Sequence, residues 1–173
     1  MPRFIAADSS PLIGLAAAGA FDLLRRLFGT VTVTRIVRDE IMAGRGMPGA
    51  AELSAAMREG WIRVAPAPLE TWRFAELGAG EASTIALALE HAGDALVLMD
   101  DAAGRAQAAE LRLEVAALAD LLLAAKRAGL VDAVAPIFER LARRAFVVPE
   151  AEVRRTLEEA GEAGHASARQ MGD

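Results

Sequence analysis

The sequence contains no cysteine and only two histidines among its 173 residues. The absence of cysteine excludes disulfide bonds, thiolate metal sites and a cysteine nucleophile. With His91 near the end of a helical pattern and His165 close to the C-terminus, a zinc site of the usual His/Cys kind is disfavoured. Neither histidine stands where it would serve a serine nucleophile. The acidic side chains are therefore the main candidates for chemistry.

Long apolar runs are also missing, since no stretch approaches the roughly 20 residues that a membrane-spanning helix needs. The N-terminus lacks a signal-peptide pattern, because Asp8 interrupts the first apolar run. We therefore expect a soluble, cytoplasmic protein. Its length suits one domain, and a hydrophobic share of 54% provides a sizeable core. We expect this domain to cover residues 1–161, followed by a flexible tail over 162–173.

Motifs of large nucleotide-binding classes do not occur. No Gly-x-Gly-x-x-Gly follows the first apolar run, and there is no Gly-x-x-x-x-Gly-Lys-Ser/Thr. The net charge of −5 counts against a basic nucleic-acid-binding surface. That objection weakens if several acids lie together and are neutralised by bound metal.

Short apolar runs alternate with longer helical patterns, which is typical of βα units on a parallel sheet. The predicted strands are Phe4–Ala7, Val31–Val33, Ile62–Val64, Ala95–Met99 and Leu113–Val115. Helices are predicted over residues 9–19, 21–28, 35–42, 50–59, 81–90, 102–111, 118–128, 132–144 and 150–160. The sequence therefore predicts an α/β fold.

Acidic residues directly follow two of these strands. Asp8 follows the first strand, and Asp100 and Asp101 follow the strand over 95–99. Ligands of parallel α/β sheets bind beyond the carboxyl ends of the strands. Either position alone is ambiguous, because aspartate also favours turns and helix caps. Their recurrence on two strands favours a shared functional site.

Glu40 lies in a helical pattern whose apolar stripe is Ile36, Val37 and Ile41. Because residues three and four apart share a helix face, we expect Glu40 at the buried edge of this helix. An acid placed there needs either an arginine partner or a metal ion.

Two further charged residues are ambiguous on local grounds. Glu81 opens its helix, where the helix dipole alone favours an acid. Arg105 comes one turn after Asp101, so it either contacts a phosphate or neutralises the acidic pair.

The order of these motifs resembles the PIN-domain family, in particular a branch of predicted nucleic-acid-binding proteins and VapC-like toxin ribonucleases. The segments that carry the likeness are Ala7–Ile13, Phe21–Leu24, Val33–Ile41, Gly80–Ala82, Val97–Asp101, Gly104–Ala106 and Leu121–Gly129. Together they span about residues 4–161. The resemblance implies a Rossmann-like three-layer α/β/α sandwich with a mostly parallel sheet. It also implies a ribonuclease that depends on Mg²⁺ or Mn²⁺.

Carried over by position, the resemblance implies catalytic roles for Asp8, Glu40, Glu81 and Asp100. It implies metal binding by Asp8, Glu81 and Asp100, with Asp101 as neighbour and substitute. Ser10 matches the family's hydroxyl beside the first acid, and it is implied to hold the scissile phosphate or a ligating carboxylate. Arg105 is a candidate substrate contact.

One position departs from the family pattern. Where the branch has Gly-Thr before its late helix, this chain has Ala117 and Leu118, followed by Asp120. The change removes a hydroxyl from the neighbourhood of the site. Three consequences stay open: catalysis tolerates the loss, the protein is impaired, or Asp120 contributes instead.

The resemblance implies RNA as the substrate and an antitoxin protein as a candidate partner. We also expect a homodimer, since the chain is rich in apolar residues and has Trp61 and Trp72 outside the obvious core helices. The alternative is a non-catalytic PIN-fold module that binds nucleic acid or protein. A phosphotransfer domain is disfavoured, because the acidic pair ends a late strand and Ser10 stands where a dehalogenase-type phosphatase has its second Asp.

Overall fold

The computed structural model describes residues 4–44, 46–68 and 70–164. Five strands form one sheet in the order β3-β2-β1-β4-β5, and every pairing is parallel. The strands are β1 (Phe4–Ala7), β2 (Val31–Thr34), β3 (Ile62–Ala65), β4 (Ala95–Leu98) and β5 (Glu114–Ala116). The predicted α/β class and parallel sheet are therefore confirmed.

Helices follow the strands at the predicted places. They are α1 (Ser9–Ala17), α2 (Leu23–Phe28), α3 (Arg35–Ala43), α4 (Ala50–Glu59), α5 (Ala79–Leu89), α6 (Ala102–Glu110), α7 (Leu118–Arg127), α8 (Ala135–Arg143) and α9 (Glu150–Glu159). The sequence did not predict η1 (Thr71–Phe74), a single short 3₁₀ turn. It placed the start of α8 three residues early, because the cap comes from Glu162: the backbone N–H groups of Val134 and Ala135 donate to its carboxylate.

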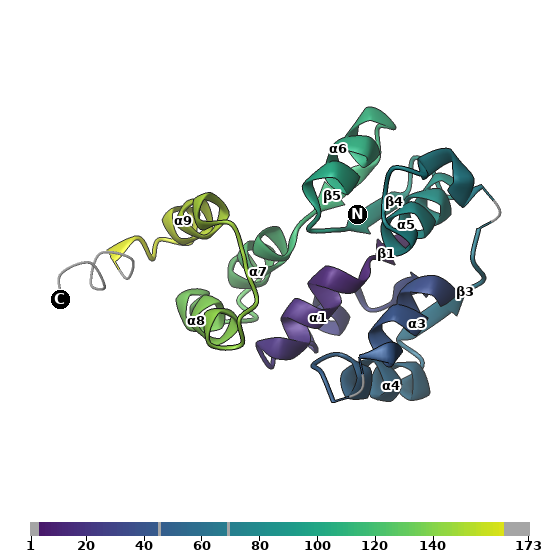
Figure 1. Ribbon diagram of the computed structural model, residues 1–173. Coiled ribbons are helices and arrows are strands. Elements are labelled where there is room, and N and C mark those ends of the chain that lie inside the picture. The colour runs from purple at the N-terminus through teal and green to yellow at the C-terminus, as the bar shows by residue number, and fades with distance from the viewer. Residues whose placement is uncertain (1–3, 45, 69, 165–173) are drawn as a thin grey trace.

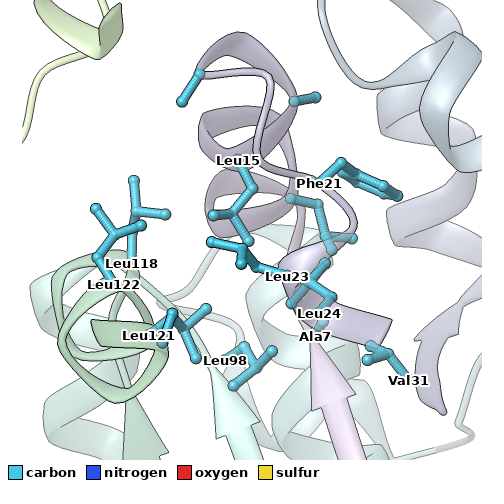
Figure 2. Packing of buried hydrophobic residues seen from close by; sticks show 14 of the residues in the cluster. Ala7, Leu15, Phe21, Leu23, Leu24, Val31, Leu98, Leu118, Leu121 and Leu122 are labelled. Carbon is cyan, nitrogen blue, oxygen red and sulfur yellow. The ribbon is translucent and has the colours of Figure 1, made fainter. Parts of the chain in front are cut away.

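Two apolar clusters cover the two faces of the sheet. Successive strand residues point to opposite faces, so Ala7 and Leu98 pack with α1, α2 and α7 (Figure 2). Their neighbours Ala6 and Val97 pack instead against α5 and α6, beside Ile85. Burial of both faces gives the three-layer α/β/α arrangement that the family resemblance implied.

The register of the two central strands fixes the site. Ala7 of β1 pairs with Leu98 of β4, so both strands end at the same edge of the sheet. The backbone N–H of Asp8 donates to the carbonyl of Leu98 at 2.9 Å, which extends this pairing by one residue. Asp8 and Asp100 therefore leave the sheet side by side.

The C-terminal helices pack beside α7 and α1 (Figure 1). The carboxylate of Glu162 is buried against the start of α8, so the predicted boundary after Gly161 falls one residue before this anchor. Residues 165–173, most of the predicted tail, lie outside the described residues. No helix in the described ranges is long and apolar enough to cross a membrane.

The two tryptophans differ in their surroundings. Trp61 is buried, and its ring lies 5.6 Å from that of Phe21. It lies outside the helices, as expected, and it reaches the core from the turn before β3. Trp72 is 74% exposed and stays a candidate for an interface.

Candidate active site

Four acidic residues meet at the carboxyl edge of the sheet. Asp8 lies buried between β1 and α1, and its pKa is raised to about 7, chiefly by burial. The nearby charges of Glu81, Glu40 and Asp100 contribute to this rise, whereas the backbone N–H of Ser9 opposes it. Glu40 comes from α3, Glu81 from α5 and Asp100 from the end of β4. The structure thus brings these four predicted site residues to one place.

Gly80 lies against the two closest carboxylates. A Cβ atom added to Gly80 would lie 2.5 Å from Oε2 of Glu40 and 2.9 Å from Oδ1 of Asp8. A side chain at position 80 would therefore displace these carboxylates, and glycine lets the first turn of α5 approach both acids where they stand. This role was not predicted from the sequence. The signal for it was a glycine directly before the acid Glu81 at a helix start.

The position predicted for Glu40 needs correction. Val37 and Ile41 form the buried stripe of α3, whereas Glu40 is exposed rather than at a buried edge. Its side chain nevertheless reaches Gly80, because glutamate is long enough to extend back over the start of α5. The α3 helix therefore delivers a solvent-facing carboxylate to the site.

Glu81 combines a structural role with its place in the site. Its Oε2 accepts a hydrogen bond of 3.0 Å from the backbone N–H of Gly78, which caps the start of α5. This is the local role that the sequence indicated. Its charge still acts on Asp8, so capping and proximity to the other acids are compatible.

Asp100 is held by two donors. The backbone N–H of Leu118 donates to Oδ1 at 2.7 Å, and the hydroxyl of Ser10 donates to Oδ2 at 3.2 Å. Burial raises the pKa of Asp100, while these two donors lower it. The charge of Glu152 raises it and that of Arg105 lowers it. Glu152, in the first turn of α9, was not singled out from the sequence.

A buried pair of hydroxyls ties together the helices that carry the acids. Thr34 Oγ1 lies 2.7 Å from Ser83 Oγ, and it also accepts from the backbone N–H of Val37 to cap α3. Ser83 in turn donates to the carbonyl of Gly80. This link fixes α3 relative to α5, and so Glu40 relative to Gly80.

Two other acidic residues named from the sequence have defined partners. Asp101 caps α6, because its Oδ1 accepts from the backbone N–H of Gly104 at 2.9 Å. Asp120 caps α7 through the N–H of Ala117 and pairs with Arg155. Both carboxylates thus have structural roles in helix capping.

The donor set suits a hard divalent cation. Oδ1 of Asp8 is buried and has no hydrogen-bond partner within the described residues. An unpaired carboxylate oxygen in that environment is costly unless a cation or proton occupies it. Oxygen ligands are those that Mg²⁺ and Mn²⁺ prefer. As the side chains stand, however, no three acids or histidines of the described chain form a metal-binding group. In the structure Glu81 caps the start of α5, and Asp100 accepts hydrogen bonds from Leu118 and Ser10.

A family model described as a PIN domain matches residues 4–162, which include all five strands and all four acids of the site. Among curated proteins and solved structures, none matches this chain. PIN domains are generally nucleases that use divalent metal ions, which supports a nuclease-type function here. The match covers almost the entire described chain, and its fold agrees with the parallel sheet. The chain therefore belongs to the PIN-domain family.

Proposed function

We propose that this protein is a ribonuclease that hydrolyses RNA phosphodiesters with Mg²⁺ or Mn²⁺. The observation that carries the proposal is the buried, unpaired Oδ1 of Asp8 beside three further carboxylates. Clustered acids repel one another, and a divalent cation is the partner that offsets this repulsion. An isolated structural acid would instead have an arginine or a helix N–H as its partner.

The residues divide into distinct roles in this proposal. Asp8, Glu81 and Asp100 would hold the cation, which when bound lowers the pKa of a water and neutralises charge on the phosphate. Glu40, exposed beside Asp8, orients the attacking water and accepts its proton. Ser10 fixes the carboxylate of Asp100. The expected products carry a 5′-phosphate and a 3′-hydroxyl, as the family resemblance implies.

We further propose that the protein acts in the cytoplasm as the toxin of a toxin–antitoxin pair. The support is the likeness to the VapC-like branch, in which many relatives have that role. A neighbouring reading frame that encodes a short basic DNA-binding protein would support the pairing. We also propose a homodimer, for which the exposed ring of Trp72 is the main support. Light scattering over a wide concentration range tests it, and a monomer mass throughout would contradict it.

The test of the nuclease proposal is cleavage of a labelled single-stranded RNA in Mn²⁺, Mg²⁺ or EDTA. We expect cleavage by the wild type with either metal, none in EDTA, and none by Asp8→Asn. Asp22→Asn is the matched control, because Asp22 is an exposed aspartate at the start of α2. The Asp22→Asn protein should cleave RNA as the wild type does. If the wild type binds RNA but never cuts it, the chain is a non-catalytic PIN-fold module.

A further inference from the structure

A salt bridge joins two helices beside Asp100. Nη2 of Arg105 donates to Oε1 of Glu152 at 2.7 Å. Arg105 lies in α6, and Glu152 lies 47 positions later in the first turn of α9. Their side chains are only 28% and 21% exposed, so the pair is partly shielded from solvent.

The pair lies on the Asp100 side of the acidic site. Both of its charges act on Asp100, Glu152 by repulsion and Arg105 by attraction. Arg105 therefore places a guanidinium within electrostatic reach of Asp100. In the structure that guanidinium is already bound to a carboxylate.

The α9 helix does not depend on this pair for its position. Arg155 of α9 bonds to Asp120 of α7 at 2.7 Å, and Arg127 of α7 bonds to Glu159 of α9 at 2.8 Å. Leu157 is also buried in the core between the helices. Since α9 is held by these contacts, the bond from Glu152 to Arg105 is free to break without releasing the helix.

We propose that Glu152 holds Arg105 in place of a substrate phosphate, and that RNA binding exchanges this carboxylate for a phosphate oxygen. This inference rests on the proposed function. A guanidinium forms the same charged N–H···O contacts with carboxylates and with phosphates, so the exchange preserves its hydrogen bonding. Glu152 is then a positioning residue that keeps Arg105 oriented in the free protein and competes with RNA for it.

A double-mutant cycle tests this exchange. The affinity for a fluorescein-labelled single-stranded RNA of ten nucleotides is measured in EDTA at about 0.15 M salt, where no cleavage occurs. Glu152→Gln should bind about two- to fivefold more tightly, the range of a partly exposed ion pair. Arg105→Ala should bind RNA more weakly. The slope of its log affinity against log salt concentration should fall by about the contribution of one phosphate contact.

Glu159→Gln is the matched control, since it removes the same charge from the same helix and also breaks an arginine pair. Its partner Arg127 lies at the far end of α7 from Leu118, about 13 Å along the helix, where screening is strong. Glu159→Gln should therefore change the RNA affinity by less than about twofold.

The cycle separates exchange from simple repulsion. If Glu152 competes for Arg105, its substitution should gain little in an Arg105→Ala background. A pure repulsion would give the same or a larger gain there, and that result would overturn the inference. Equal effects of Glu152→Gln and Glu159→Gln, or no RNA binding by any variant, would also overturn it.

Two further measurements complete the test. In the wild type, RNA should shift the Nε–H resonance of Arg105, and this readout needs no variant to fold. In the cleavage assay with Mn²⁺, Glu152→Gln should lower KM and leave kcat unchanged.

If RNA binding depends on Arg105 but no cleavage occurs, the nuclease proposal fails and the exchange stands. If the wild type cleaves RNA and the cycle shows no coupling, the exchange alone fails.

Discussion

The backbone N–H of Leu118 donates a hydrogen bond of 2.7 Å to Oδ1 of Asp100, where the chain enters α7. The first N–H groups of a helix have no partner within the helix, and its positive dipole end favours a carboxylate. Any residue except proline supplies this N–H. Leucine in place of the family's threonine therefore keeps the main anchor of Asp100, and the hydroxyl of Ser10 supplies a second donor.

Asp8→Asn should stabilise the metal-free protein at pH 8. The pKa of Asp8 is raised from 3.8 to about 7, so its ionised form destabilises the fold by up to roughly 4 kcal/mol at that pH. The amide removes the charge and keeps the shape. Urea unfolding in EDTA measures the difference, with Asp22→Asn as a control that should change little. A less stable Asp8→Asn would contradict the electrostatic account.

The stability of the metal-free wild type should fall as pH rises from about 4 to about 7. In this window the unfolded chain has released the Asp8 proton near its usual pKa of 3.8, whereas the folded chain keeps it until about 7. The unfolded state then binds fewer protons, so the free energy of unfolding decreases with pH. Asp100, whose pKa is also raised, contributes with the same sign.

The comparison with Asp8→Asn isolates the contribution of Asp8 to this pH dependence. The difference in the free energy of unfolding between the two proteins should grow through the window and level off above about pH 7. Urea titrations at half-unit pH steps in EDTA provide the curve. A constant difference between pH 4 and pH 8 would show that Asp8 titrates normally.

Ser10→Ala should move the acidic limb of the pH–rate profile to higher pH. The hydroxyl of Ser10 lowers the pKa of Asp100, so its removal raises that pKa further and leaves fewer molecules ionised at low pH. Ser54→Ala is the control, because the Ser54 hydroxyl bonds to Ala50 within α4. If the acidic limb of Ser10→Ala were unchanged, that limb would report the ionisation of a group other than Asp100.

Gly80→Ala should weaken metal binding and cleavage while leaving the domain folded. In a helix, alanine is favoured over glycine by about 1 kcal/mol, so a loss of function must come from the added methyl group. That group would meet Glu40 and Asp8 at 2.5 and 2.9 Å and displace their carboxylates. We expect metal affinity to fall about ten- to a hundredfold, the effect of disturbing ligand orientation.

Gly44→Ala is the matched control for this substitution. Gly44 has a φ of −76°, and a Cβ atom there would come no closer than 3.4 Å to its neighbours. Calorimetric titration with Mn²⁺ and thermal melts should show near-wild-type behaviour. Normal metal binding by Gly80→Ala would contradict the tight approach of α5 to the acids.

Thr34→Val should destabilise the fold by about 1–2 kcal/mol and lower activity as well. It removes the cap of α3 and leaves the buried hydroxyl of Ser83 without this partner. Thr34→Ser, which keeps the hydroxyl, is the control and should recover most of the stability. Equal losses in the two variants would point to packing rather than hydrogen bonding.

Most of the fold followed from local patterns, because buried parallel strands and amphipathic helices have distinct periods. Asp8 and Asp100 could be predicted as site residues from the same patterns, since each follows an apolar strand. Glu81 was visible only through the family resemblance, because a helix cap explains it equally well. Gly80, Glu152 and the hydroxyl of Ser83 could not be assigned, because their roles come from contacts between distant helices.

The order of strands in the sheet has a consequence for the synthesis of this protein. β1 is made first, yet it lies at the centre of the sheet and pairs with β4, and Ser10 bonds to Asp100 across 90 positions of the chain. The donor from Leu118 comes later still. The growing chain therefore has no assembled site until α7 has left the ribosome. For a protein proposed to cut RNA, cleavage therefore cannot begin before all five strands and α7 have been made.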